Sequence, residues 1–192
     1  YCPADSILYK IIETYHFEDN ICFLAASIVA KKLTSDAKVV LVDIKYGEAS
    51  VISKYSTAKQ LASLLVHMFK KCGVKCVIAI TNTHQLIGES VGNAVEVLDA
   101  LNVLKGKQNM LREVSVAYAV EMMLKADKRL NRKDAYDMAV MALDSGLAYN
   151  QFLDIVRTQH GDVMAVKNNE IFNPKQSIVF KTNRSGYVGN VN

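Results

Sequence analysis

The sequence predicts an α/β fold, with a partial parallel or mixed sheet flanked by helices and a helical segment after it. Two short, continuous apolar runs, at 38–44 and 75–81, have the composition of buried strands. Between them, apolar residues recur at helical spacing over 56–72. A strand, a helix and a second strand in this order favour a parallel pair joined by a right-handed crossover. No strand pattern appears from 111 to 159, which indicates a helical region.

Local signals define the elements in the first half of the chain. Residues 4–33 have a helical pattern that is interrupted near 16–20. Ser56 or Thr57 is expected to cap the helix between the two strands, because a hydroxyl can accept a hydrogen bond from a free N–H of the first turn. Gly73 is expected to end the same helix, since glycine readily adopts the left-handed conformation that follows a last helical turn.

Beyond the second strand, the pattern predicts a loop, several helices and one more strand. The loop is expected at 83–92, and alternating apolar residues predict a strand at 177–181. Glycine-containing breaks separate the helices from one another. The helices themselves are expected at 93–104, 111–126, 132–143 and 148–159.

The composition is that of an ordinary globular chain, long enough for one domain or for one domain with part of another. Apolar residues make up 51% and charged residues 22%, and there are only two prolines and nine glycines. The net charge of +4 is spread along the chain without a basic run, so no nucleic-acid partner is expected. The longest apolar run, 21–30, is too short to cross a bilayer, and no membrane partner is expected.

The cysteine pattern points to a reducing compartment. Cys2, Cys22, Cys72 and Cys76 contain no pair at the Cys-x-x-Cys spacing of a zinc site or a redox motif. All four are therefore expected to be reduced thiols in a cytoplasmic protein.

Ser27 and Lys31 are the first candidate binding residues. They lie four positions apart in an apolar helical segment, so their side chains leave from the same face. A hydroxyl that donates or accepts and an ammonium that only donates suit an uncharged, carbonyl-rich ligand. The alternative interpretation is a buried serine beside a lysine whose charged end reaches the solvent. Ligands of open α/β sheets lie beyond the carboxyl ends of the strands, which here lead into loops at 46–54 and 83–92.

A series of short motifs extends this interpretation. The motifs are Pro3-Ala4-Asp5, Ala26-Ser27-Ile28, Lys31-Lys32-Leu33, Val42-Asp43-Ile44-Lys45, Gly92-Asn93-Ala94-Val95-Glu96-Val97, Ser145-Gly146 and Gly186-Tyr187-Val188. Their order and spacing resemble those of the thymidine and pyrimidine-nucleoside phosphorylases over essentially the whole chain.

The resemblance implies a homodimeric pentosyltransferase of pyrimidine nucleotide salvage. Such an enzyme cleaves the N-glycosidic bond of a pyrimidine nucleoside with inorganic phosphate as co-substrate, giving free base and (deoxy)ribose 1-phosphate. Residues 1–165 would be part of its large α/β lobe, with a helical stretch at 110–160, and 166–192 would begin a truncated carboxyl-terminal domain. The chain begins at Tyr1 without a methionine and within a motif, so it is expected to be a central fragment of the subunit.

The resemblance also assigns substrate-binding residues. Tyr9, Ser27 and Lys31 match the family positions that contact the pyrimidine base. Two positions depart from the family pattern: Ile12 stands where the family has a base-binding arginine, and Val51 stands where it has an aromatic residue. Loss of a guanidinium would leave a base carbonyl without its hydrogen-bond donor.

A potassium ion is the further group that the resemblance implies. By spacing, the carbonyl oxygens of Ile87 and Ser90 and the side chain of Asp99 match the family's cation ligands. Oxygen-only ligation suits a hard cation.

The sequence contains no stretch of the Lys-His-Ser-Thr-Gly-Gly type that binds phosphate in the family, so no catalytic residue is assigned in this chain. The 192 residues alone are therefore expected not to catalyse phosphorolysis. Two alternatives stay open: a non-catalytic remnant of the same family, favoured by Ile12 and Val51, and a related phosphoribosyltransferase that shares the lobe architecture.

Overall fold

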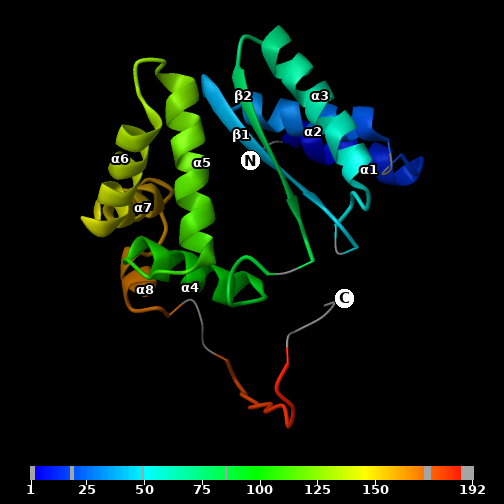
Figure 1. Ribbon diagram of the computed structural model, residues 1–192. Coiled ribbons are helices and arrows are strands. Elements are labelled where there is room, and N and C mark those ends of the chain that lie inside the picture. Colours follow the sequence, from blue (N-terminus) through cyan, green and yellow to red (C-terminus); the bar gives the residue numbers. More distant parts are fainter. Residues whose placement is uncertain (1–2, 18–19, 49, 85, 171–173, 187–192) are drawn as a thin grey trace. The chain divides into compact units, whose positions relative to one another are not determined.

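The computed structural model describes residues 3–17, 20–48, 50–84, 86–170 and 174–186 (Figure 1). The chain divides into two compact units. The first unit comprises the first three helices, both strands and residues 121–130, which include the end of the fifth helix. The second unit comprises the first part of that helix and the other helices. The elements, in order, are α1 (Pro3–Thr14), α2 (Ile21–Leu33), β1 (Val39–Tyr46), α3 (Tyr55–Lys71), β2 (Lys75–Asn82), α4 (Asn93–Leu104), α5 (Met110–Ala126), α6 (Arg132–Asp144), α7 (Leu147–Thr158) and α8 (Val163–Lys167).

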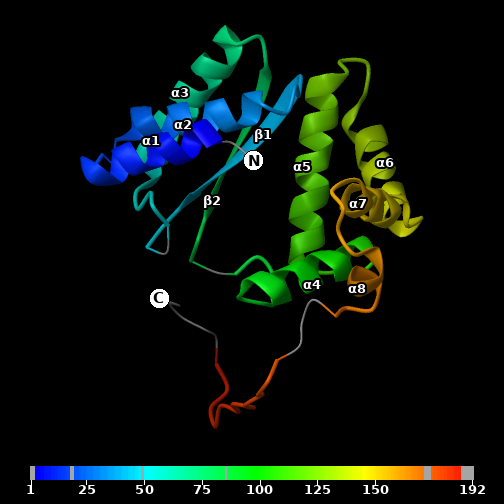
Figure 2. The same cartoon turned by 180° about the vertical axis from the view of Figure 1, so that it is seen from behind.

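The first unit is built on the parallel pair that the sequence predicts. β1 and β2 are hydrogen-bonded in parallel, with a register that runs from Val39 opposite Lys75 to Tyr46 opposite Asn82. α3 connects the two strands, and α2 packs against α3, as both views show (Figures 1 and 2). The prediction of a mixed α/β fold with a parallel strand pair is confirmed.

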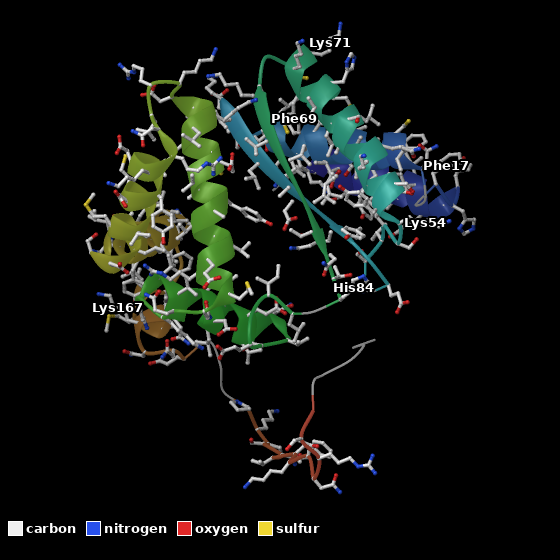
Figure 3. All side chains as sticks on the ribbon, viewed as in Figure 1. Phe17, Lys54, Phe69, Lys71, His84 and Lys167 are labelled. Atoms are coloured by element: carbon white, nitrogen blue, oxygen red, sulfur yellow. The ribbon has the colours of Figure 1, made fainter. Side chains whose placement is uncertain are left out.

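The core of this unit lies between the helices and one face of the strands. Val40 and Ile44 lie four positions apart on β1 and therefore share the face that packs against the helices, as expected for a strand with period two. Phe69 and two leucines of α3 are among the largest fully buried side chains (Figure 3). Burial of a leucine or phenylalanine side chain stabilises a fold by about 1.5–3 kcal/mol. The two leucines are Leu61 and Leu65, and the other buried members of this core are Ala25, Val29, Ile52 and Ala58.

The break between α1 and α2 falls where the sequence predicts it. His16, with φ of 55°, lies in the left-handed region that ends α1. Asn20 begins α2 by accepting a hydrogen bond from the N–H of Cys22 at 2.9 Å. Ile12, near the end of α1, is buried, so this position contributes to packing.

The ends of α3 confirm one prediction and correct another. Gly73 has φ of +73°, which confirms it as the left-handed residue that follows the helix. The prediction of a cap at Ser56 or Thr57 is wrong, since the helix begins one residue earlier and its cap position is Lys54, without a side-chain hydrogen bond. Both hydroxyl residues therefore lie inside the first turn.

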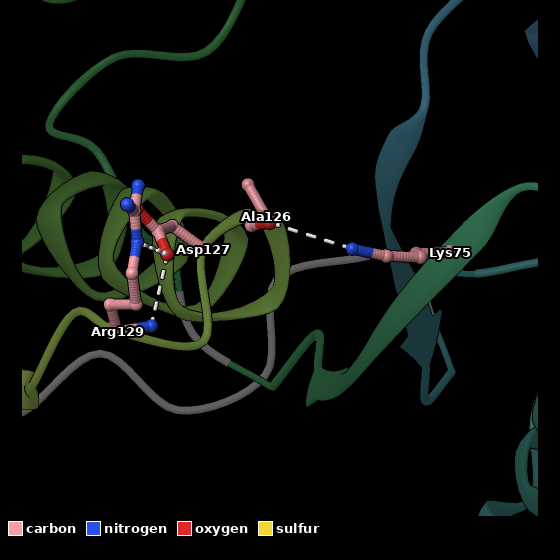
Figure 4. A network of polar contacts seen from close by, with 4 residues as sticks. All are labelled: Lys75, Ala126, Asp127 and Arg129. Atoms are coloured by element: carbon pink, nitrogen blue, oxygen red, sulfur yellow. Dashed lines mark hydrogen bonds and ion pairs between the residues drawn. The ribbon is translucent and has the colours of Figure 1, made fainter.

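Residues 121–130 belong to the first unit and make polar contacts near the start of β2 (Figure 4). The ammonium of Lys75 donates to the carbonyl oxygen of Ala126 at 3.4 Å. The guanidinium of Arg129 pairs with Asp127 at 2.8 Å and lowers the pKa of that carboxyl group. These exposed contacts are weak individually and add little stability.

The regular elements that the structure describes in the second unit are helices, as the sequence predicts for residues 93–159. The helices α4 to α7 lie within two residues of their predicted bounds. α8 was not anticipated, because five residues are too short to show a hydrophobic period. Asp162 caps α8 by accepting from the N–H groups of Met164 and Ala165. Buried Arg112 of α5 donates to Asp144 at 2.6 Å.

The predicted strand at 177–181 is absent from the described chain, where these residues are irregular. Ile178 and Phe180 are 90% and 91% exposed. An extended segment becomes a strand only when its backbone pairs with another strand, and no such partner is described beside it. Alternation of apolar residues is therefore not enough by itself to predict a strand at 177–181.

Among the described residues, no helix combines the length and the apolar character that crossing a bilayer requires.

Candidate functional site

Ser27 and Lys31 are brought together by a third residue, Asp5. Ser27 donates its hydroxyl proton to Asp5 Oδ1 at 2.7 Å, and the Lys31 ammonium lies 3.1 Å from Asp5 Oδ2. Asp5 comes from α1 and its two partners come from adjacent turns of α2, so the cluster joins two packed helices. We call these three residues the Asp5 cluster.

Tyr9 borders the Asp5 cluster from α1, one turn after Asp5. The ammonium of Lys31 lies 5.6 Å from the centroid of the Tyr9 ring, within the range of a cation–π contact. Tyr9 is half exposed, whereas Ser27 is 3% exposed. A ligand would therefore meet Lys31 and Tyr9 at the surface before it reached the hydroxyl of Ser27.

The hydrogen bond from Ser27 is the main reason that the pKa of Asp5 lies below its usual value. Lys31 lowers this pKa further, and burial partly opposes both effects. Asp5 is thus ionised at neutral pH and accepts from both neighbours. Because the Ser27 proton points to Asp5, the Ser27 oxygen keeps its lone pairs for accepting a hydrogen bond.

The Asp5 cluster therefore offers an acceptor and a donor side by side. The Ser27 oxygen can accept from an N–H, while the Lys31 ammonium can donate to a neighbouring carbonyl oxygen. The arrangement of the two side chains is compatible with the carbonyl-rich ligand that their spacing predicts.

The two positions that depart from the expected pattern have different surroundings. Ile12 is 9% exposed and packs as an apolar core residue, so no donor is available there. Val51 lies in the loop after β1 and is 77% exposed. Neither residue supplies a polar contact to the Asp5 cluster.

A second polar cluster, which sequence reasoning missed, lies near the ends of the strands. The Lys45 ammonium is 2.6 Å from Asp43 Oδ2 and donates to the Thr81 hydroxyl at 2.9 Å. Thr81 in turn donates to Asp43 Oδ1 at 2.6 Å. Asp43 and Lys45 are two apart on a strand, so their shared face was a signal that could have predicted the pair.

A cavity of about 430 Å³ lies beside this second cluster within the first unit. Its lining includes Asp43 and Lys45 together with Ser50 and Thr83 from the loops that follow the strands. The region at the strand ends is therefore hollowed, as expected for an α/β sheet. The lining does not include Tyr9, Ser27 or Lys31, so this cavity and the Asp5 cluster are separate features.

Asp99 belongs to a third cluster, which lies in the second unit. Its carboxylate is buried on α4, where Oδ2 accepts the N–H of Glu89 at 2.8 Å. The Lys107 ammonium lies 3.6 Å from Asp99 Oδ1 and 2.8 Å from Glu89 Oε2. The hydrogen bond to Glu89 is the main cause of the raised pKa of Lys107. We call Glu89, Asp99 and Lys107 the Asp99 cluster.

The described donor set at Asp99 does not fit a resident metal ion as it stands. One carboxylate oxygen is engaged by a backbone N–H, and the other faces an ammonium that carries the same charge as potassium. A metal ion would have to displace Lys107. Among the described residues, no group of three or more His, Cys, Asp or Glu side chains is placed to hold a metal ion. The cation site expected at Ile87, Ser90 and Asp99 stays a prediction.

Two further features of the described chain lie outside these clusters. His84 follows β2, and its side chain is exposed (Figure 3). A second cavity of about 430 Å³ lies between α5 and α6, with Arg112 and Arg132 in its lining. The Arg112 guanidinium already pairs with Asp144 across this cavity wall.

The parallel strand pair with its helical crossover defines an α/β protein. No protein-family model matches the chain. The chain does match individual proteins. It is 28% identical to a protein named thymidine phosphorylase of Mycoplasmoides pirum, over 90% of the chain and 42% of that protein.

Two more relatives agree with this match. Identity is 28% to a pyrimidine-nucleoside phosphorylase of Staphylococcus aureus, over 97% of the chain and 43% of that protein. It is also 28% to a thymidine phosphorylase of Metamycoplasma hominis, over 96% of the chain and 68% of that protein. The chain resembles thymidine and pyrimidine-nucleoside phosphorylases over nearly its whole length, and spans less than half the length of the first two relatives.

Proposed function

We propose that this chain carries the pyrimidine-binding part of a pyrimidine-nucleoside phosphorylase, with Tyr9, Ser27 and Lys31 as the residues that hold the base. The observation that carries the proposal is the convergence of Ser27 and Lys31 on Asp5, which presents an acceptor and a donor together. The similarity to proteins named thymidine and pyrimidine-nucleoside phosphorylase supports it.

The reaction proposed for the whole protein is phosphorolysis. Inorganic phosphate forms a bond to C1′ of the sugar, the N-glycosidic bond breaks, and its electron pair leaves with the base. The products are the free base and (deoxy)ribose 1-phosphate, as expected of a pentosyltransferase in pyrimidine nucleotide salvage. In this scheme Lys31 stabilises the negative charge that develops on the departing base.

The proposal assigns binding, and not turnover, to this chain. Its sequence lacks a phosphate-binding stretch of the Lys-His-Ser-Thr-Gly-Gly type, so phosphate would be held by other parts of the protein. We also propose that residues 1–165 belong to the α/β lobe, that 166–192 begin a further domain, and that the whole protein is a cytoplasmic homodimer.

The test is a titration of the purified chain with uridine, thymidine and uracil, followed by calorimetry or by amide NMR shifts. We expect Lys31→Met to weaken binding at least about tenfold, because a charge-assisted hydrogen bond contributes about 1.5–3 kcal/mol. Lys32→Met is the matched control, since Lys32 is the neighbouring lysine of α2 and is exposed. This control should bind as the native chain does.

The second candidate function is a non-catalytic remnant of the same family, and the burial of Ile12 favours it. A native chain that binds no pyrimidine would support the remnant and contradict the proposal. Equal binding by Lys31→Met and Lys32→Met would show that any pyrimidine is held elsewhere. Release of free base in the presence of inorganic phosphate, followed by chromatography, would contradict the assignment of binding without turnover.

A further inference from the structure

The Asp99 cluster buries a charged group within the second unit. The side chain of Asp99 is 7% exposed, so its carboxylate has lost most of its hydration. A buried carboxylate persists only with hydrogen-bond donors and a compensating positive charge. Among the described residues, the Asp99 carboxylate contacts the N–H of Glu89 and the ammonium of Lys107.

The loop before α4 closes directly onto this carboxylate. The Glu89 N–H donates to Asp99 Oδ2, and a Cβ atom at Gly88 would come within 3.0 Å of the same oxygen. Glycine at this position therefore lets the backbone approach the carboxylate closely. The loop conformation and the charge of Asp99 depend on each other.

Lys107 reaches the same place from beyond the other end of α4. Gly106, with φ of +103°, turns the chain after the helix, and the N–H of Lys107 donates to the carbonyl oxygen of Asn102 at 2.9 Å. This turn directs the Lys107 ammonium back to Asp99 and to Glu89 Oε2. One positive charge thereby bridges a helix residue and a loop residue.

We propose that the ammonium of Lys107 acts as a built-in monovalent cation, which holds the loop 87–90 against α4 in place of a potassium ion. An ammonium group carries the same charge as potassium, and its three N–H bonds can be shared among several oxygen atoms. A tethered cation does not dissociate, so the loop keeps its conformation without added salt. This inference does not depend on whether the chain binds a pyrimidine.

The test measures the thermal unfolding midpoint in KCl, NaCl and choline chloride at equal ionic strength, which separates specific cation binding from screening. The native chain is expected to unfold at the same temperature in all three salts. Lys107→Ala is expected to lower the midpoint by about 5 °C in choline chloride and to regain at least half of that loss in KCl.

Two further variants serve as controls. Lys105→Ala removes a lysine two positions away, whose ammonium lies over the Tyr149 ring, and should respond equally to every salt. The double variant Asp99→Asn with Lys107→Ala removes both charges and should lose the response to KCl. If Lys107→Ala does not fold in choline chloride, the yield of refolding in KCl against choline chloride provides the same readout.

Three results would overturn the proposal. A rise of the native midpoint in KCl that disappears in Asp99→Asn would show a potassium site beside Lys107. A loss in Lys107→Ala no larger than in Lys105→Ala would show that the ammonium does not support the loop. If KCl does not restore the midpoint of Lys107→Ala, or if this variant refolds in none of the three salts, Lys107 forms an ion pair that a free cation cannot replace.

Discussion

The Asp5 cluster and the Asp99 cluster both pair one carboxylate with one lysine, but the carboxylates have different partners. Asp5 receives hydrogen bonds from two side chains of a neighbouring helix, Ser27 and Lys31. Asp99 receives one from a backbone N–H in a loop and faces Lys107. Asp5 therefore orients two side chains, whereas Asp99 holds the backbone of the loop that contains Glu89.

This difference suggests different roles for similar chemistry. Side-chain hydrogen bonds can be given up to a ligand at low cost when the group is close to solvent, as Lys31 is. A backbone hydrogen bond to a buried carboxylate cannot be given up without changing the loop. We therefore expect the Asp5 cluster to matter for binding and the Asp99 cluster to matter for the local structure of the second unit.

The largest effect should come from Asp99→Ala. We expect a loss of about 2–3 kcal/mol in the free energy of unfolding, because the Glu89 N–H and Lys107 both lose a buried partner. Urea unfolding measures this loss. Asp154→Ala is the control, since Asp154 and Arg157 form an exposed pair within α7 that should matter little. Equal losses in both variants would remove the contrast between the Asp99 cluster and an ordinary surface pair.

The next effect should come from Gly88→Ala. The added methyl group would lie 3.0 Å from Asp99 Oδ2, so the carboxylate or the loop must shift, at a cost of about 1–2 kcal/mol. Gly186→Ala, whose added methyl group would meet no described atom within 4 Å beyond its chain neighbours, is the matched control in the same urea experiment. If Gly88→Ala has the same free energy of unfolding as the native chain, the loop does not pack closely against Asp99.

A smaller effect is expected for Ser27→Ala in the Asp5 cluster. The buried hydroxyl loses its hydrogen bond to Asp5, and we expect a loss of about 1 kcal/mol. Ser115→Ala provides the comparison, because the Ser115 hydroxyl is exposed and bonds only to the preceding turn of its own helix. If Ser27→Ala and Ser115→Ala lose the same free energy of unfolding, Asp5 finds an equally good hydrogen-bond donor elsewhere.

The smallest expected effect is a dependence on acid pH. The pKa of Asp5 is lowered in the folded chain, chiefly by Ser27, so its ionised form stabilises the fold above the pKa of the unfolded state. This contribution is lost as the pH falls below about 4 and through the folded pKa. Urea midpoints between pH 6 and pH 3 should fall less steeply in Asp5→Asn than in the native chain. Urea midpoints that fall equally steeply in the native chain and in Asp5→Asn would contradict the lowered pKa of Asp5.

Much of the secondary structure could be predicted because it depends on short-range patterns. Buried parallel strands have continuous apolar runs, and both strands were found within two residues of their expected ends. The failures have physical causes as well. The five residues of α8 show no period, and the alternating segment at 177–181 has no described strand to pair with.

The candidate site could be predicted only where its residues are neighbours in sequence. Ser27 and Lys31 share a helix face by their spacing, and the structure places both on one carboxylate. Asp5 lies 22 positions before Ser27, and no sequence period links the two residues. Lys107 was missed for the same reason, since its contact with Asp99 depends on the turn at Gly106.

The sequence by itself determined the α/β class, the parallel strand pair and the resemblance to the pyrimidine-nucleoside phosphorylases, because these rest on local periodicity and on motifs in order. Only the tertiary structure decided which charges meet. The packing of α1 on α2 placed Asp5 between Ser27 and Lys31, and the turn after α4 placed Lys107 beside Asp99. Burial then gave each pair its importance, since a charge removed from water must find a partner within the fold.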